Sequence, residues 1–331
     1  MKRDLYWDSL KFVLIFLVVY GHIAPRYSES SQFNMAIYNF IYMFHMPLFV
    51  FVSGRFSHIR DRKRYFSGIF KLFETYIVFQ IIRTVLQGVG GKELTLTLLF
   101  TPQWTLWYLV VLIYWRLAIC FLPEGILLHR KRILIASFLI SLAAGFIPID
   151  NAFAAQRAFS FLPFFVMGYY SSDIEIRKYI NEISPFFAML VLIVTFVFFF
   201  FYFSDKDLVF IHHCKSSYWA YDFQHTMLRF VARCIYVPSA ILLGAVVMRL
   251  VPTNETLAKW GSVTLFIFIY HTFAINVLIE LTKREYIPQN EVMLLIYAII
   301  ITFGLLYLSH FKILTYLLNP LSYYQKRVKV G

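Results

Sequence analysis

Residues 8–22 decide the fold, and they read Asp8-Ser9-Leu10-Lys11-Phe12-Val13-Leu14-Ile15-Phe16-Leu17-Val18-Val19-Tyr20-Gly21-His22. On an α-helix the Lys11–His22 spacing is three turns plus about 20°, so both side chains share a face about 16 Å apart along the axis. Asp8 lies one turn before Lys11 on the same face. Ionisable groups inside hydrocarbon are costly unless they line a polar cavity or form a site. We therefore predict that this helix carries chemistry and is more than an anchor.

The same three residues have a simpler interpretation. Lys11 can extend its charge to the inner membrane surface while His22 lies at the outer one, as ordinary helix-end residues do. That interpretation does not explain why Asp8, Lys11 and His22 share one face.

Composition places the chain in the membrane. Of its 331 residues 60% are hydrophobic and 15% charged, whereas soluble domains carry about 25% charged residues. The net charge of +13 comes from Lys and Arg in short loops between apolar runs, which the positive-inside rule explains without a nucleic-acid partner. Because Cys120, Cys214 and Cys234 lack metal-ligand spacing, we expect no metal site.

The apolar runs predict an all-α, polytopic bundle of about ten spans that forms one membrane domain over residues 1–331. The expected segments are 6–24, 34–54, 66–87, 103–122, 132–148, 157–170, 183–203, 227–250, 262–281 and 291–317. Lys2 and Arg3 precede the first segment, Arg55–Arg64 follow the second, and Lys326, Arg327 and Lys329 follow the last. This distribution predicts that both termini are cytoplasmic. The polar interval 204–226, with His212 and His213, is expected to form an external lid or a re-entrant element.

Further polar residues lie within or beside these segments, and each has two interpretations. His45, two residues before Pro47, is either a structural donor at a helix kink or part of a site. Ser53 adjoins the basic stretch Arg55–Arg64, which attracts either anionic lipid headgroups or the phosphates of a cytoplasmic donor. Trp107 belongs to an aromatic belt or to a substrate platform. Arg157 and His271 are paired structural residues or part of a polar interior.

The ordered set of motifs resembles the integral-membrane acyltransferase 3 family, in particular its fucose 4-O-acetylase-like branch. The motifs are Asp8 to Lys11 followed by His22, Phe44-His45-Met46-Pro47-Leu48-Phe49 with Ser53-Gly54, Leu106-Trp107-Tyr108-Leu109, Arg157 with Phe161 to Tyr169, and Ile269-Tyr270-His271. Many relatives have Arg where this chain has Lys11, and Lys cannot form the bidentate contacts of a guanidinium.

This resemblance implies an enzyme of the plasma (inner) membrane that uses acyl-CoA, usually acetyl-CoA, as donor and a carbohydrate hydroxyl as acceptor, with no tightly bound cofactor. It also implies that Lys11 and His22 form the essential pair. We expect Asp8 to hold Lys11, and His45, Ser53, Trp107, Arg157 and His271 to contact donor or acceptor. Membrane lipids are the expected surroundings.

The resulting hypothesis is O-acetyl transfer with His22 as general base, or transfer through a transiently acylated histidine. His22 lies about 25 Å into the span and Lys11 about 9 Å, so a cytoplasmic thioester has to reach deep into the bundle. A transporter or flippase of a lipid-linked sugar is the alternative from another class, although no inverted repeat is visible. A membrane sensor without catalysis is a third interpretation.

Overall fold

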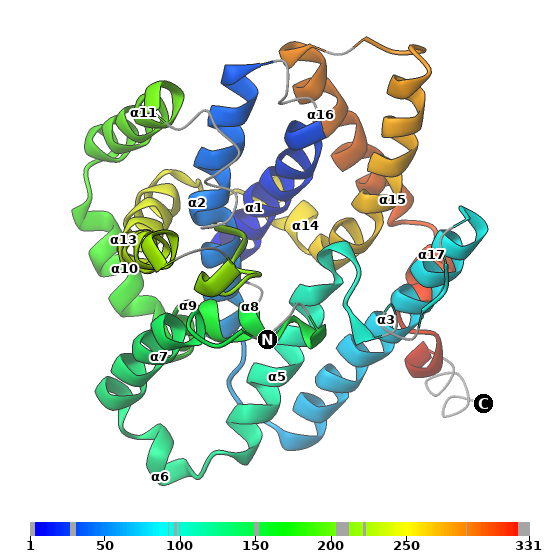
Figure 1. Ribbon diagram of the computed structural model, residues 1–331. Helices are drawn as coiled ribbons and strands as arrows, with labels where there is room; N and C mark the ends of the chain where they lie inside the picture. The colour runs from blue at the N-terminus through cyan, green and yellow to red at the C-terminus, as the bar shows by residue number, and fades with distance from the viewer. Residues whose placement is uncertain are drawn as a thin grey trace.

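The structure is a computed structural model that describes residues 4–26, 31–91, 93–95, 98, 100–148, 152–202, 212–220, 223–288 and 290–323. Within these ranges every regular element is a helix, which confirms the all-α prediction (Figure 1). The helices are α1 (Leu5–Ile23), α2 (Gln32–Arg55), α3 (Arg62–Val89), α5 (Trp107–Phe121), α6 (Glu124–Leu127), α7 (Arg130–Ala144), α8 (Ala155–Ser160), α9 (Leu162–Tyr170), α10 (Asp173–Glu182), α11 (Pro185–Tyr202), α13 (Phe223–Leu250), α14 (Glu255–Gly261), α15 (Thr264–Lys283), α16 (Glu291–Leu308) and α17 (Lys312–Leu318).

Helix α1 lies at the centre of the bundle, where it contacts α2, α14, α15 and α16 (Figure 1). It begins where the Asp4 side chain accepts a hydrogen bond from the Tyr6 backbone N–H, which satisfies one donor that a helix start leaves unpaired. Its apolar side chains are mostly buried, and Leu10, Leu14 and Ile15 are fully so. The helix that carries the ionisable residues is therefore surrounded by protein.

Glycines bring backbones together at three points on α1 and α2. A Cβ on Gly54 would overlap the Phe165 carbonyl of α9, and a Cβ on Gly168 would overlap the Phe51 carbonyl of α2. A Cβ on Gly261 of α14 would overlap the Asp8 carbonyl of α1. At these crossings only glycine allows the helices to approach so closely. The Asp8 end of α1 and the Arg55 end of α2 are held by these crossings, and we call this side of the bundle the Arg55 end.

Seven helices in the described ranges are long and apolar enough to cross a membrane: Leu5–Ile23, Gln32–Arg55, Trp104–Phe121, Pro185–Tyr202, Thr226–Leu250, Thr264–Lys283 and Glu291–Leu308. The chain is thus a multi-pass membrane protein. The other predicted segments differ in detail: 66–87 lies within the charged helix α3, 132–148 extends past the end of the short α7, 157–170 is divided between α8 and α9, and 291–317 between α16 and α17.

The predicted orientation stays a prediction. Lys2, Arg3, Lys326, Arg327 and Lys329 lie outside the described residues. The interval 204–226 is described only in part, and residues 212–220 of it pack against the bundle, as the site below shows.

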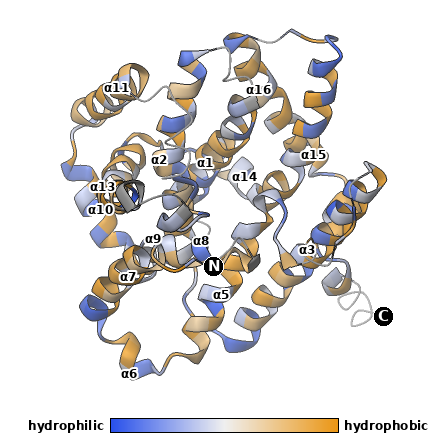
Figure 2. Cartoon of the chain, viewed as in Figure 1, coloured by the Kyte–Doolittle hydropathy of each residue, from blue (hydrophilic) through white to orange (hydrophobic). Residues whose placement is uncertain are grey.

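Helix α11 is strongly apolar and lies mostly exposed at the edge of the bundle. The 18 residues of this helix have a mean hydropathy of 2.5, yet only 11% of them are buried within the protein. Figure 2 shows this helix as a hydrophobic rod at the edge of the molecule. An exposed apolar surface of this size needs a covering, and we assign lipid to it because the chain is a membrane protein.

Candidate active site

Tyr42 of α2 is the centre of a group of imidazole rings. Its ring centroid lies 4.5 Å from that of His45, 5.4 Å from that of His212, 5.1 Å from that of His213 and 6.3 Å from that of His22. The His271 ring lies 5.3 Å from that of His22. Five of the nine histidines of the chain thus meet at one place. We call these five residues together with Tyr38 and Tyr42 the histidine cluster.

The cluster joins two predicted site residues that are far apart in sequence. His22 comes from the end of α1 and is half-buried, whereas His271 comes from the first half of α15 and has no exposed surface. The His22 ring therefore contacts other side chains of the bundle, those of Tyr42 and His271. The sequence offered His22, His45 and His271 as separate candidate site residues, and the structure brings their rings together, while their chemical roles remain predictions.

Two of the rings are held by the same local device. His45 Nδ1 lies 2.8 Å from the Ile41 carbonyl oxygen, and His271 Nδ1 lies 3.0 Å from the Ile267 carbonyl oxygen. Because a carbonyl only accepts, the proton of each neutral ring lies on Nδ1, and Nε2 carries the lone pair. The carbonyl freed by Pro47 belongs to Met43, so His45 donates to a different carbonyl from the one expected at the kink.

Residues 212–220 complete the cluster from outside the spans. The Tyr38 hydroxyl lies 2.6 Å from His213 Nε2, and His212 Nε2 lies 3.1 Å from Asn39 Oδ1. Burial, with a smaller contribution from the neighbouring His45, lowers the pKa of His212 to about 3. Burial likewise holds the pKa of His213 well below its usual value. Both rings are neutral at pH 7, and the choice between an external lid and a re-entrant element for this interval stays a prediction.

Arg157 connects this segment to a tryptophan. Its Nε donates to the His213 carbonyl over 3.1 Å, and its guanidinium carbon lies 4.5 Å from the centre of the Trp107 ring. The Trp107 ring also stacks on Phe161 at 5.5 Å. The predicted residues Arg157 and Trp107 therefore act on each other, and Arg157 borders the histidine cluster.

Asp8 and Lys11 lie elsewhere. The Lys11 Nζ is 2.9 Å from Asp8 Oδ1 and 4.5 Å from the centre of the Phe56 ring. The predicted pairing of the two side chains is present, but it lies towards the Arg55 end, whereas His22 is three turns away. Ser53 is also apart from the cluster, and its hydroxyl shares a hydrogen bond with that of Tyr108.

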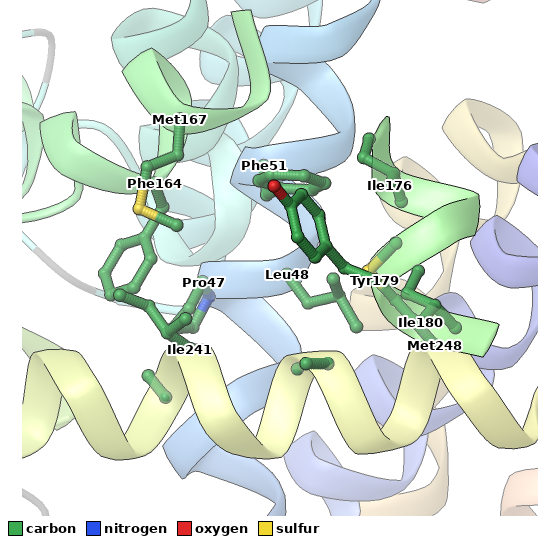
Figure 3. Close-up of a pocket in the computed structure, with 13 residues that line it drawn as sticks. Pro47, Leu48, Phe51, Phe164, Met167, Ile176, Tyr179, Ile180, Ile241 and Met248 are labelled. Carbon is green, nitrogen blue, oxygen red and sulfur yellow. The ribbon is translucent and has the colours of Figure 1, made fainter. Parts of the chain in front are cut away.

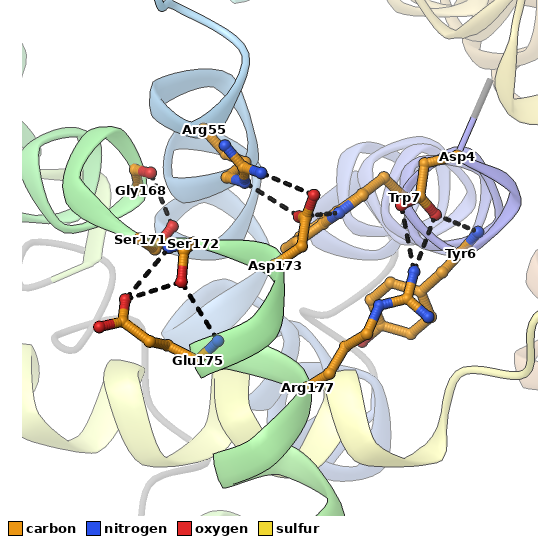
Figure 4. A network of polar contacts seen from close by, with 10 residues as sticks. All are labelled: Asp4, Tyr6, Trp7, Arg55, Gly168, Ser171, Ser172, Asp173, Glu175 and Arg177. Atoms are coloured by element: carbon orange, nitrogen blue, oxygen red, sulfur yellow. Dashed lines mark hydrogen bonds and ion pairs between the residues drawn. The ribbon is translucent and has the colours of Figure 1, made fainter. Parts of the chain in front are cut away.

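The Arg55 end is tied together by one carboxylate. Asp173 accepts hydrogen bonds from Trp7 Nε1 over 2.9 Å and from Arg55 Nε over 3.0 Å, and its second oxygen lies 2.7 Å from an Arg55 terminal nitrogen (Figure 4). Burial raises the pKa of Asp173, but the hydrogen bonds and the charges of Arg55 and Arg177 outweigh it and lower the pKa overall. Arg55 therefore serves as a structural clasp between α2 and α10.

Further basic residues of this stretch lie at the surface. Arg60, Arg62 and Arg64 are exposed. The neighbouring His58 ring stacks on Tyr169 at 4.5 Å, and burial with the charges of Arg55 and Arg60 lowers its pKa. Within the basic stretch, Arg55 thus forms a structural ion pair with Asp173, while Arg60, Arg62 and Arg64 form an exposed, positively charged surface.

Sequence reasoning missed the two tyrosines of the cluster and did not assign a role to Arg83. Tyr42 precedes His45 by three positions and so shares its helix face, which is the signal that would have found it. Arg83 donates to the Thr272 hydroxyl, and its guanidinium lies 5.2 Å from the Trp104 ring and 4.5 Å from the Phe273 ring. This cation therefore adjoins the helix turn that carries His271.

A cavity of about 270 Å³ lies at a different place. Side chains of α2, α9, α10 and α13 line it, among them Leu48, Phe164, Ile180 and Met248 (Figure 3). None of the predicted site residues is part of this lining. Among the residues that the structure describes, no group of three or more His, Cys, Asp or Glu is arranged to hold a metal ion. The histidine cluster is therefore the place where the chemistry is best supported.

Fold and site together define a multi-pass membrane protein whose interior holds a cluster of titratable rings. The sequence pattern of the acyltransferase 3 family, described as an acyltransferase domain, matches residues 4–311. Because this match covers nearly the whole chain, the protein belongs to that family.

Two curated relatives carry the name nodulation protein NolL. The one from Mesorhizobium japonicum is 35% identical over 112 residues, which are 32% of this chain and 25% of that protein. The one from Sinorhizobium fredii is 46% identical over 56 residues, which are 16% of this chain and 15% of that protein. The matches thus span at most a quarter of these relatives. No solved structure matches the chain.

Proposed function

We propose that the protein transfers an acyl group, in the first place acetyl, from acyl-CoA to a carbohydrate hydroxyl, with His22 as the general base. The observation that carries this proposal is the ring environment of His22. The half-buried His22 lies against the buried His271 and Tyr42 in the interior of an acyltransferase. A neutral imidazole next to the acceptor hydroxyl can remove its proton as a general base.

In the proposed reaction, His22 alone moves the proton from the acceptor hydroxyl to the leaving group. The acceptor hydroxyl oxygen attacks the thioester carbonyl carbon while His22 removes its proton. The carbon–sulfur bond then breaks, and the proton passes from His22 to the leaving thiolate of CoA. A covalent acyl-histidine is the alternative route, and it would use the same ring as nucleophile.

We propose that the donor enters at the Arg55 end. Lys11 and the exposed Arg60, Arg62 and Arg64 supply positive charge there, and basic groups bind phosphates well. The thioester of CoA lies at the end of a long pantetheine arm, far from the phosphates. Phosphates near Lys11 and a thioester near His22, about 16 Å further along α1, are thus compatible with one bound donor.

The acceptor would contact the cluster from the side of residues 212–220. Tyr38, Tyr42 and Trp107 offer aromatic faces there, and Arg157 and His45 offer polar groups. We propose a sugar of a cell-surface glycan or its precursor, handled at the plasma membrane, and the fucose 4-O-acetylase-like branch belongs to this proposal. Membership in an acyltransferase family favours transfer over the transporter or sensor interpretations.

The test is acetate transfer from radiolabelled acetyl-CoA by the full chain in nanodiscs, with membrane glycans as acceptor. The variant His22→Ala is compared with His310→Ala, whose ring is exposed at the end of α16. We expect a loss of at least ~100-fold for His22→Ala and wild-type activity for His310→Ala. Retained transfer by a folded His22→Ala protein would refute the assignment.

A further inference from the structure

His271 is a buried ring with one unused nitrogen. Its exposed fraction is 0%, its Nδ1 is occupied by the Ile267 carbonyl, and its Nε2 has no hydrogen-bond partner among the residues that the structure describes. Buried polar atoms in native proteins nearly always have a partner, and each exception needs an explanation. Because the proton is on Nδ1, the partner that Nε2 lacks is a donor.

His22 is the ring at the right distance to be that donor. Two imidazoles that face each other edge to edge across a hydrogen bond have centroids about 5 Å apart, and these two centroids are 5.3 Å apart with an interplanar angle of 40°. The separation thus suits an N–H···N bond, although the rings are not yet aligned for one. His22 is half-buried, whereas His271 is fully buried and held by its backbone contact.

We propose that His271 is a positioning residue for His22: in the substrate-loaded enzyme its Nε2 accepts a hydrogen bond from one N–H of the His22 ring, which directs the other ring nitrogen at the acceptor hydroxyl. This inference rests on the proposed function. His271 exchanges no proton and forms no covalent bond. It fixes the His22 tautomer and stabilises the imidazolium that forms when His22 removes the hydroxyl proton, as the orienting group of a catalytic triad does.

His45 shows that the backbone contact alone does not make a ring suitable for this role. It has the same Nδ1 contact to a carbonyl four residues earlier, but the ring that it faces most closely is that of Tyr42 at 4.5 Å. The position on α15 beside His22 is what distinguishes His271.

The experiment compares two substitutions at the same position. In His271→Gln the side-chain oxygen can replace Nε2 as acceptor, whereas His271→Leu has a similar volume and no acceptor. We expect His271→Leu to lower kcat by ~100-fold or more, with little change in KM for donor or acceptor, and His271→Gln to stay within about tenfold of wild type. The acid limb of the pH–rate profile should move to lower pH in His271→Leu, because the His22 imidazolium has lost its acceptor.

The control is His310→Leu, which removes a ring whose Nδ1 also faces a carbonyl, that of Tyr307, but at an exposed position. It should behave as wild type. If His271→Leu does not fold, His271→Ala with imidazole added to the assay replaces it, and added imidazole should restore part of the rate.

The outcomes separate this inference from the proposed function. An inactive His22→Ala with a fully active His271→Leu overturns only the positioning role. Equal loss in the folded Leu and Gln variants with an unshifted acid limb also overturns it, since that pattern indicates a packing role. An active His22→Ala overturns the proposed base, and with it this inference.

Discussion

The ammonium of Lys11 lies 2.9 Å from the carboxylate of Asp8, one turn back on the same helix. The side chains are 25% and 10% exposed, so removing either one leaves a largely buried charge without its partner. We expect Asp8→Asn and Lys11→Met each to lower the free energy of unfolding by ~1–3 kcal/mol. The double variant should lose less than the sum of the two. Thermal unfolding of the detergent-solubilised proteins measures this, and strictly additive losses would contradict a coupled pair.

The crossing of α2 and α9 predicts a strong effect of one methyl group. Ala at Gly54 or at Gly168 would collide with a backbone carbonyl of the other helix, and backbone cannot move aside as a side chain can. We expect each variant to lower the free energy of unfolding by ~2 kcal/mol or more. The unfolding temperature and the yield of folded protein should fall with it. Gly304→Ala on α16 is the control, because nothing lies within 4 Å of a Cβ built there. Equal stability of Gly54→Ala and Gly304→Ala would rule out the close crossing.

His58 predicts a dependence of stability on pH. Its pKa in the folded protein lies below the usual 6.5 because of burial and the charges of Arg55 and Arg60. A histidine with a lowered pKa contributes stability above pH 6.5, and that contribution is lost as pH falls through the folded pKa. Wild type should therefore lose more thermal stability between pH 7.5 and about 5 than His58→Phe, which keeps a ring against Tyr169 but does not titrate. Parallel curves for both proteins would show that His58 is not responsible.

Arg157 is expected to hold residues 212–220 against the bundle. Lys at this position keeps the charge but loses both the Nε donor and the planar face over Trp107. Backbone amides around His213 should then exchange with deuterium roughly tenfold faster, with no change in α15. Hydrogen-exchange mass spectrometry measures this, and unaltered protection of residues 212–220 would argue against the contact.

Much of this architecture was predictable because membrane constraints are simple. A run such as 8–22 has to be a helix in hydrocarbon, since no other local structure satisfies its backbone. The one-turn spacing correctly predicted the Asp8–Lys11 contact. The breaks between α8 and α9 and between α16 and α17 were not predicted, because apolar residues continue across both.

The site was only partly predictable. His22, His45 and His271 were recognised as ionisable groups in apolar runs, but nothing local shows that the rings meet, because their helices are joined by long-range packing. Shared helix-face periodicity suggested that Lys11 and His22 form one unit, yet their axial separation places them in different surroundings. The part played by His212 and His213 depends on a segment folding back onto α2, and no periodicity encodes such a return.

The glycine crossings have a consequence for how substrates come and go. They fasten α1 to α14 and α2 to α9 on the side where Lys11 lies, while His22 lies near the other end of α1 and His45 near the middle of α2. Because backbone contacts fix the helices at that end, binding of the donor there cannot require these helix pairs to separate. Exchange of the acceptor should instead depend on residues 212–220, which cover the rings from the other side.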